Sequence, residues 1–274
     1  MNLRIVADSS ANLYSSDGFA SVPMRVCTAE TEYVDTPALD VAAMLSDLAA
    51  YKGRSSTACP GVGDWLAAFE GADAVLAITI TSELSGSYNA ACAAAQEFHA
   101  HHPEARIFVL DSRTAGAHMQ LIVEKAQQLA EAESDFDAIV SKLQNYQKHT
   151  NLLFSLSSLN NFARNGRVNP ALAKAVGILG LRIVGMAKDG NLHPMHKPRG
   201  DKKALAQLVS SMTELGWVGG AVRISHTEAD EAVAELTKQL KALHPACDVA
   251  VRTNNGLCSY YCEPGGLLMA FECE

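Results

Sequence analysis

The sequence predicts a two-domain α/β protein. An N-terminal three-layer α/β/α domain with a parallel sheet spans residues 1–150, and a C-terminal two-layer domain with a mixed sheet spans 151–274. Strand and helix patterns alternate through the first half, which is typical of a parallel sheet covered on both faces. Lys188-Asp189-Gly190-Asn191 is a hairpin turn signal, so the second sheet must be at least partly antiparallel. A composition shift at residues 146–151 marks the boundary between the two domains.

Each element is predicted from the spacing of its apolar residues and from the polar or glycine residues that flank them. In the first half, the predicted strands are Leu3–Asp8, Ser21–Cys27, Ala74–Ile80 and Ile107–Asp111, and the predicted helices are Leu39–Tyr51, Gly63–Gly71, Leu84–Ala100 and Ala115–Ala132. In the second half, the predicted strands are Leu152–Leu156, Leu181–Lys188, Leu192–Lys197, Val218–His226, Asp248–Thr253 and Leu267–Glu272, and the predicted helices are Pro170–Ile178, Lys202–Leu215 and Thr227–Leu243.

Composition excludes several classes of protein. The chain has 22 Lys and Arg against 30 Asp and Glu, a net charge of −8, which argues against a general nucleic-acid binder. No run approaches the roughly 18 apolar residues that cross a bilayer, so we expect peripheral membrane contact or none. The N-terminus lacks the apolar stretch of about 7–15 residues that a secretory signal needs. The odd number of cysteines, 7, indicates reduced thiols in a cytoplasmic protein, and their spacing predicts no metal site.

One segment of the chain is strongly basic although the whole is acidic. From Asn160 to Lys203 there are nine Lys and Arg against two acidic residues, Asp189 and Asp201. Such a segment is either an ordinary solvated face or a local basic surface that attracts an anionic ligand or an acidic partner. The sequence pattern leaves both interpretations open.

Small polar clusters follow the predicted strands of the first half or precede its helices. In an open parallel sheet, ligands bind in the crevice outside the carboxyl ends of the strands. The clusters are Asp8-Ser9-Ser10, Ser55-Ser56-Thr57, Thr81 to Ser87, and Asp111 to Thr114. The third cluster opens a helix, whose free N–H groups and dipole suit a carboxylate or a phosphate near the Ser85 hydroxyl. Plain helix capping by serine is the alternative interpretation.

Several catalytic and nucleotide-binding motifs are missing from the sequence. There is no phosphate loop, Gly61-Val62-Gly63 does not continue into a dinucleotide fingerprint, and no serine lies in a nucleophile elbow. His193 and His196 are three residues apart in a predicted strand, so their side chains point to opposite faces, which makes a poor metal pair.

Several segments together resemble the DegV family of fatty-acid-binding proteins. The similar segments are RIVADSSANL at the N-terminus, STACP at 56–60, ITITSELSGSYNAA at 78–91, LDSRTAG at 110–116, LSSLNNFARNGRV at 156–168, AKDGNLHPMHKPRGDKKAL at 187–205 and EPGGLLMAFE near the C-terminus. They occur in order over nearly the whole chain.

The resemblance implies a DegV-like fold and a function. From the resemblance we expect one long-chain fatty acid between the two domains, no cofactor, and a carrier rather than an enzyme. The resemblance also implies that the protein presents the carboxylate to a separate fatty acid kinase, which makes the acyl phosphate from ATP. Thr57 and Ser85 match the residues that grip the carboxylate in the family, with Gly86 beside them. Arg167 and Arg199 match arginines on the kinase-facing surface.

The sequence departs from the family pattern near the expected carboxylate site. Ala58 and Cys59 replace a polar pair after Thr57, and Asn165-Gly166 replaces two glycines. The family histidine that approaches the carboxylate corresponds to Tyr261, a neutral phenol that can still donate a hydrogen bond. Glu263 replaces a glycine, so we expect either that its side chain points to solvent or that the head-group preference has changed.

The sequence also suggests which residues contact the acyl chain. The candidates for the apolar lining are Ile80, Leu84, Met119, Ile178 and Met269, each of which could equally be ordinary core. Two rival functions stay open at this point. One is a Ser85-dependent acyl hydrolase, which lacks a histidine base at the family position, and the other is a carrier of a different anionic amphiphile.

Overall fold

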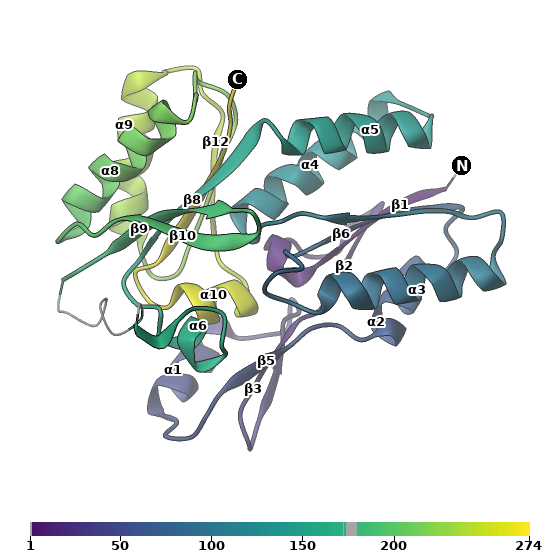
Figure 1. The fold of residues 1–274 in the computed structure, drawn as a ribbon, viewed down its shortest axis with the longest axis horizontal. Helices are drawn as coiled ribbons and strands as arrows, with labels where there is room; N and C mark the ends of the chain where they lie inside the picture. Colours follow the sequence, from purple (N-terminus) through teal and green to yellow (C-terminus); the bar gives the residue numbers. More distant parts are fainter. Residues whose placement is uncertain (1, 172, 174–179) are drawn as a thin grey trace.

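The computed structural model describes residues 2–171, 173 and 180–274. Two large sheets lie side by side, each covered by helices, and a third, small sheet lies beside them (Figure 1). Most of the predicted helix Pro170–Ile178, and Ile178 itself, lie outside the described residues. None of the helices in the described ranges is long and apolar enough to cross a membrane.

The first sheet is fully parallel, as predicted. Its strands run in the order β2-β1-β6-β7, with β1 at Leu3–Asp8, β2 at Phe19–Val22, β6 at Ala74–Thr79 and β7 at Arg106–Asp111. Helices α2 (Val62–Phe69) and α3 (Ser87–His101) cover one face, and α4 (Ala117–Ala132) and α5 (Phe136–Gln147) cover the other. The alternation of strands and helices therefore gives the predicted three layers.

The second sheet is mixed, also as predicted. Its order is β10-β9-β8-β13-β11-β12, and all neighbours are antiparallel except β11 and β12. The strands are β8 (Thr150–Leu156), β9 (Ile183–Lys188), β10 (Asn191–His196), β11 (Val222–His226), β12 (Val249–Thr253) and β13 (Leu267–Glu272). Helices α8 (Asp201–Glu214) and α9 (Asp230–Leu243) pack on one face.

Helix α4 lies between the two large sheets. Met119 and Ile122 on one side of α4 join the core over the parallel sheet, while Ala117 and Leu121 pack against strands of the mixed sheet. Residues 146–151 cover the end of α5 and the start of β8, but α4 contacts both sheets. The division into two domains at that point therefore stays a prediction.

The third sheet is missing from the sequence-based prediction. It has the order β4-β3-β5, with β3 at Arg25–Cys27, β4 at Glu32–Val34 and β5 at Ser56–Ala58. The predicted strand Ser21–Cys27 is wrong, because the chain leaves the parallel sheet after β2 and β3 pairs in this other sheet. Pro23 lies at the break, where a missing N–H cannot continue a ladder.

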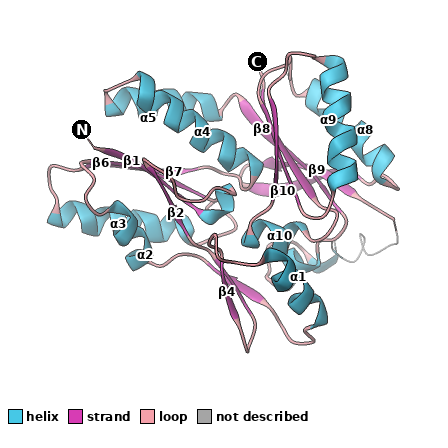
Figure 2. Cartoon of the chain, turned by 180° about the vertical axis from the view of Figure 1, so that it is seen from behind, coloured by secondary structure: helices cyan, strands magenta, loops and turns pink. Residues whose placement is uncertain are grey.

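Three helices complete the fold near the small sheet. Helices α1 (Val41–Ala50) and α10 (Gly256–Cys262) pack together there, while α6 spans Asn160–Arg164 (Figure 2). The buried carboxylate of Asp35 accepts the backbone N–H groups of Gly256 at 2.7 Å and Leu257 at 3.0 Å, which satisfies the free donors of α10. This cap fixes the N-terminus of α10 against the N-terminal half of the chain.

Candidate functional site

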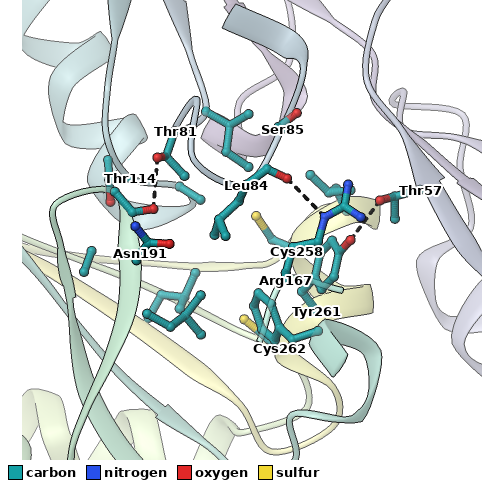
Figure 3. Close-up of a pocket in the computed structure, with 18 of the residues that line it drawn as sticks. Thr57, Thr81, Leu84, Ser85, Thr114, Arg167, Asn191, Cys258, Tyr261 and Cys262 are labelled. Atoms are coloured by element: carbon teal, nitrogen blue, oxygen red, sulfur yellow. Dashed lines mark hydrogen bonds between the residues drawn. The ribbon is translucent and has the colours of Figure 1, made fainter. Parts of the chain in front are cut away.

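A cavity of about 320 Å³ lies where the loops after β6 and β7 meet α10 and strands of the mixed sheet (Figure 3). Its size falls at the lower end of the roughly 300–1,000 Å³ typical of small-molecule sites. Its wall is mostly apolar. The larger apolar side chains that line it are Met24, Ile80, Leu84, Leu152, Phe154, Leu156, Phe162, Leu192, Leu257 and Leu268.

All four residues predicted to bind a carboxylate line this one cavity. Thr57 comes from β5, Ser85 and Gly86 from the loop before α3, and Tyr261 from α10. The Thr57 hydroxyl and the Tyr261 phenol lie 2.8 Å apart, within hydrogen-bonding distance. Figure 3 shows Thr57, Tyr261 and Ser85 on one side of the cavity, opposite Thr81, Thr114 and Asn191.

The Asp8 carboxylate fixes the loop that carries Ser85 through hydrogen bonds. The Asp8 carboxylate is fully buried and accepts the Ile80 N–H at 2.8 Å and the Ser87 hydroxyl at 2.7 Å. It also accepts the N–H and the hydroxyl of Ser10. Burial raises the pKa of Asp8, and these four hydrogen bonds oppose the rise. The Asp8-Ser9-Ser10 cluster therefore supports the site rather than lining it.

Ser85 combines the two roles that the sequence left open. Its hydroxyl oxygen accepts the N–H of Ser87, the first residue of α3, at 3.2 Å. The hydroxyl proton is not used in that bond, so it remains able to donate toward the cavity. Helix capping and ligand binding are thus compatible at this serine.

Tyr261 is held as a neutral, oriented phenol. Its ring packs on Phe162 with ring centres 4.6 Å apart, and burial raises its pKa above the usual value for tyrosine. Glu263 does not simply point to solvent, because it is half-buried and hydrogen-bonded. Its carboxylate accepts the Ser158 hydroxyl at 2.9 Å and the Asn161 N–H at 3.2 Å, at the start of α6. It is not part of the cavity wall, so it does not crowd the candidate site with a second negative charge.

Arg167 and Arg199, both predicted to face a kinase, lie in different surroundings. Arg167 is half-buried and lines the cavity, where its Nε donates to the Leu84 carbonyl at 3.1 Å. Arg199 is exposed, just before α8. Contact of either residue with a partner protein stays a prediction.

The predicted acyl-chain residues divide into two groups. Ile80 and Leu84 line the cavity. Met119 and Met269 do not line it. Met119 belongs to the core over the parallel sheet. Met269 lies on the face of β13 that packs with the cluster of α8 and α9, because strand alternation turns its neighbour Leu268 toward the cavity instead.

Several lining residues were missed although the sequence carried a signal for them. Leu152, Phe154 and Leu156 alternate along β8, so all three point to one face, and that face borders the cavity. The period of two in the predicted strand Leu152–Leu156 identifies this set. Which face of β8 borders a cavity depends on how α4 and α10 pack, and the apolar pattern of the strand does not predict that packing.

Two sheets enclose an apolar cavity with polar groups at its edge, which defines an α/β protein whose cavity suits a small amphiphilic molecule. No metal-binding cluster of His, Cys, Asp or Glu occurs in the described ranges. A family model described as an uncharacterised protein of the DegV family matches residues 2–272. The chain belongs to the DegV family, as the sequence motifs indicated.

Relatives and solved structures of similar chains agree with this assignment. A DegV domain-containing protein of Streptococcus gordonii is 36% identical over 99% of both chains. A solved DegV family protein from Eubacterium eligens, loaded with heptadecanoic acid, is 38% identical and covers 99% of this chain and 100% of its own, with a TM-score of 0.96. The Fatty Acid Kinase (Fak) B3 protein of Streptococcus pneumoniae, loaded with linoleic acid, is 34% identical, covers 100% of both chains and has a TM-score of 0.97.

Proposed function

We propose that this protein binds one long-chain fatty acid in the cavity between its sheets. The carboxylate binds Thr57, Ser85, Gly86 and Tyr261, and the acyl chain lies against the apolar wall. The observation that carries the proposal is that these four residues, from three separate segments, line one otherwise apolar cavity. The fatty acids bound in the two similar solved structures support the same class of ligand.

The two ends of the ligand contribute differently. Each buried methylene contributes about 0.8 kcal/mol, so about fifteen give on the order of 12 kcal/mol before costs. Association and ordering offset roughly 4–15 kcal/mol of that sum. A buried carboxylate also needs several charge-assisted donors, because desolvation otherwise drives it to the protonated form. The chain therefore sets affinity, and the hydroxyl and N–H donors set orientation.

The proposal includes a role beyond storage. The protein presents the carboxylate to a fatty acid kinase, which transfers phosphate from ATP to make the acyl phosphate. The name of the similar Streptococcus pneumoniae structure supports this partner. Arg199 on the exposed basic segment is our candidate for the kinase-facing surface. The seven cysteines are all free thiols in the structure, which supports a cytoplasmic location.

The structure gives the rival functions less support. No histidine is among the described residues that line the cavity, so Ser85 has no base there to activate it as a nucleophile. The Ser85 oxygen instead accepts a backbone N–H. Glu263, which raised the idea of a different anionic head group, hydrogen-bonds outside the cavity wall.

The test is the double variant Thr57→Ala/Ser85→Ala. Each lost hydroxyl donor to a carboxylate removes about 1.5–3 kcal/mol, so we expect the loss of two donors to lower fatty-acid affinity by about 100-fold or more. Binding of a fatty acid to the delipidated protein is measured by calorimetry. Ser82→Ala is the matched control, because Ser82 lies in the same loop but donates to Asp111 at 2.6 Å, outside the cavity wall. Unchanged affinity in the double variant would remove the proposed carboxylate site.

A further inference from the structure

One side of the cavity holds a hydroxyl group without a partner. Thr114 lines the cavity and is 3% exposed, and its Oγ1 forms no hydrogen bond with any described residue. A buried hydroxyl of this kind is costly, because it has given up its hydrogen bonds to water and gained none in exchange. Such a group in the wall of a ligand cavity therefore favours a ligand that supplies the missing hydrogen bond.

The backbone of Thr114 is hydrogen-bonded on both sides, which holds the side chain in place. The Thr114 carbonyl accepts the Thr81 N–H at 2.9 Å, and this bond ties the loop after β7 to the loop after β6. The same carbonyl accepts the Ser112 hydroxyl at 3.2 Å, and the Thr114 N–H donates to the Ser112 Oγ at 3.2 Å. The side-chain hydroxyl is the polar group of Thr114 that these bonds leave unused.

Thr81, the neighbouring threonine of the wall, provides a contrast. Its side chain is also buried, but its hydroxyl donates to the Gly190 carbonyl at 2.9 Å and accepts the Glu83 N–H at 3.3 Å. The hydroxyl of Thr81 is thus satisfied within the protein and does not depend on a ligand. Of these two buried threonines, Thr114 is the one whose hydroxyl is available to a ligand.

Thr114 lies away from the proposed carboxylate site. In Figure 3, Thr114 is on the side of the cavity opposite Thr57, Ser85 and Tyr261, and the side chain of Leu84 lies between the two sides. A fatty acid whose carboxylate binds that opposite group therefore brings part of its chain to Thr114. Methylene groups form no hydrogen bonds of this kind, so an unsubstituted chain leaves the Thr114 hydroxyl unpaired.

We infer that Thr114 selects a fatty acid that carries a hydroxyl group on its chain, remote from the carboxylate. The two hydroxyls pair, because each can donate one hydrogen bond and accept another. A ligand hydroxyl left unpaired in an apolar cavity is itself costly, so the pair removes two unfavourable groups at once. The inference rests on the proposed fatty-acid function and narrows the class of ligand that this cavity takes.

The test compares octadecanoic acid with octadecanoic acids that carry one hydroxyl on the second, tenth, twelfth or last carbon. Each acid is titrated into the delipidated protein. A hydroxyl buried without a partner lowers affinity by about 5- to 150-fold. The hydroxy acid whose hydroxyl reaches Thr114 avoids that loss, so it should bind the wild type at least as tightly as octadecanoic acid.

Thr114→Val removes the hydroxyl and keeps the shape of the side chain. It should weaken binding of the selected hydroxy acid by about 5- to 150-fold, because the ligand hydroxyl then has no partner. Octadecanoic acid should bind the variant at least as tightly as it binds the wild type. The acid with its hydroxyl on the second carbon holds that group beside the carboxylate, so Thr114→Val should not change its affinity.

The matched control is Thr79→Val on β6. The Thr79 hydroxyl is likewise buried without a partner among the described residues, but Thr79 lies outside the cavity wall. Both variants lose a buried, unpaired hydroxyl, so both should fold and melt at or above the wild-type temperature. Thr114→Val alone should change the ligand preference.

The inference is overturned if every hydroxy acid binds the wild type more weakly than octadecanoic acid does. It is also overturned if Thr114→Val and Thr79→Val give the same affinities. In either case the proposed function stands as long as octadecanoic acid binds and Thr57→Ala/Ser85→Ala weakens that binding. A protein that binds none of these acids contradicts the proposed function itself.

Discussion

Filling part of the cavity should shorten the fatty acid that the protein prefers. Ala187 on β9 lines the cavity and is half-buried beside Leu152 and Phe154 of β8. Strand alternation turns its neighbour Met186 to the opposite face, where it packs with the core of α8 and α9. A larger residue at position 187 therefore enters the cavity without passing through that core.

The size of the effect follows from the added atoms. Ala187→Leu places three more carbon atoms against the cavity of about 320 Å³ and displaces a similar length of acyl chain. At about 0.8 kcal/mol per methylene, three displaced methylenes cost about 2.4 kcal/mol, a loss of about 60-fold in affinity. This loss applies to the longest chain that fills the cavity. Chains about three carbons shorter should keep their affinity, because they leave that space empty.

The assay is a competition between fatty acids of different length for the delipidated protein. The optimum should move to shorter chains in Ala187→Leu. The control is Met186→Leu, a volume-conserving change on the other face of the same strand, which should leave the optimum unchanged. If the optimum for Ala187→Leu stays where it is in the wild type, the acyl chain does not lie in this cavity.

Two further predictions concern stability. His118 on α4 donates from Nε2 to the Thr150 hydroxyl at 2.7 Å, and burial lowers its pKa to about 3. The unfolded chain then binds more protons than the folded one below the usual pKa of about 6.5, so stability falls as pH falls from 6.5 toward 3. Between pH 7.5 and 5.5 the wild type should lose about 1.4 kcal/mol more unfolding free energy than His118→Gln in urea titrations, and equal losses would contradict the neutral, buried imidazole. Met119→Ala and Met269→Ala should each lower the unfolding free energy by about 2–5 kcal/mol, because both side chains are fully buried in cores outside the cavity wall. Neither change should alter the chain length of the preferred fatty acid. A changed chain-length preference in either variant would place that residue in the ligand site.

Local sequence patterns predicted the layers of the fold because the apolar residues within each layer follow a single strand or helix pattern. Strand β6 is buried at all six positions, as its continuous apolar run indicated, and the helices beside it show the helical period. The hairpin of β9 and β10 was predicted from a single turn signal in the sequence. The small sheet was missed because its strands are three residues long, too short to show a period. Helix α10 was missed because its cap, Asp35, is more than two hundred residues away in the chain.

The residues assigned from a family motif at the carboxylate end line the cavity, whereas only some of those assigned by their apolar character do. Thr57, Ser85 and Tyr261 came from the family resemblance and lie together on the cavity. Met119 and Met269 were as apolar as Ile80, but burial in a core and burial against a ligand produce the same sequence pattern. Arg167 was recognised as one of a basic set, whereas its place in the wall depends on carbonyl groups of Leu84 and Asn165.

The most direct measurement is the mass of the intact protein purified without denaturation. Native mass spectrometry should find one added molecule per chain, with the mass of a long-chain fatty acid, and should find it at much lower occupancy in Thr57→Ala/Ser85→Ala. A chain that stays empty after incubation with fatty acids, or one that carries a phospholipid instead, would contradict a cavity built for a single free carboxylate.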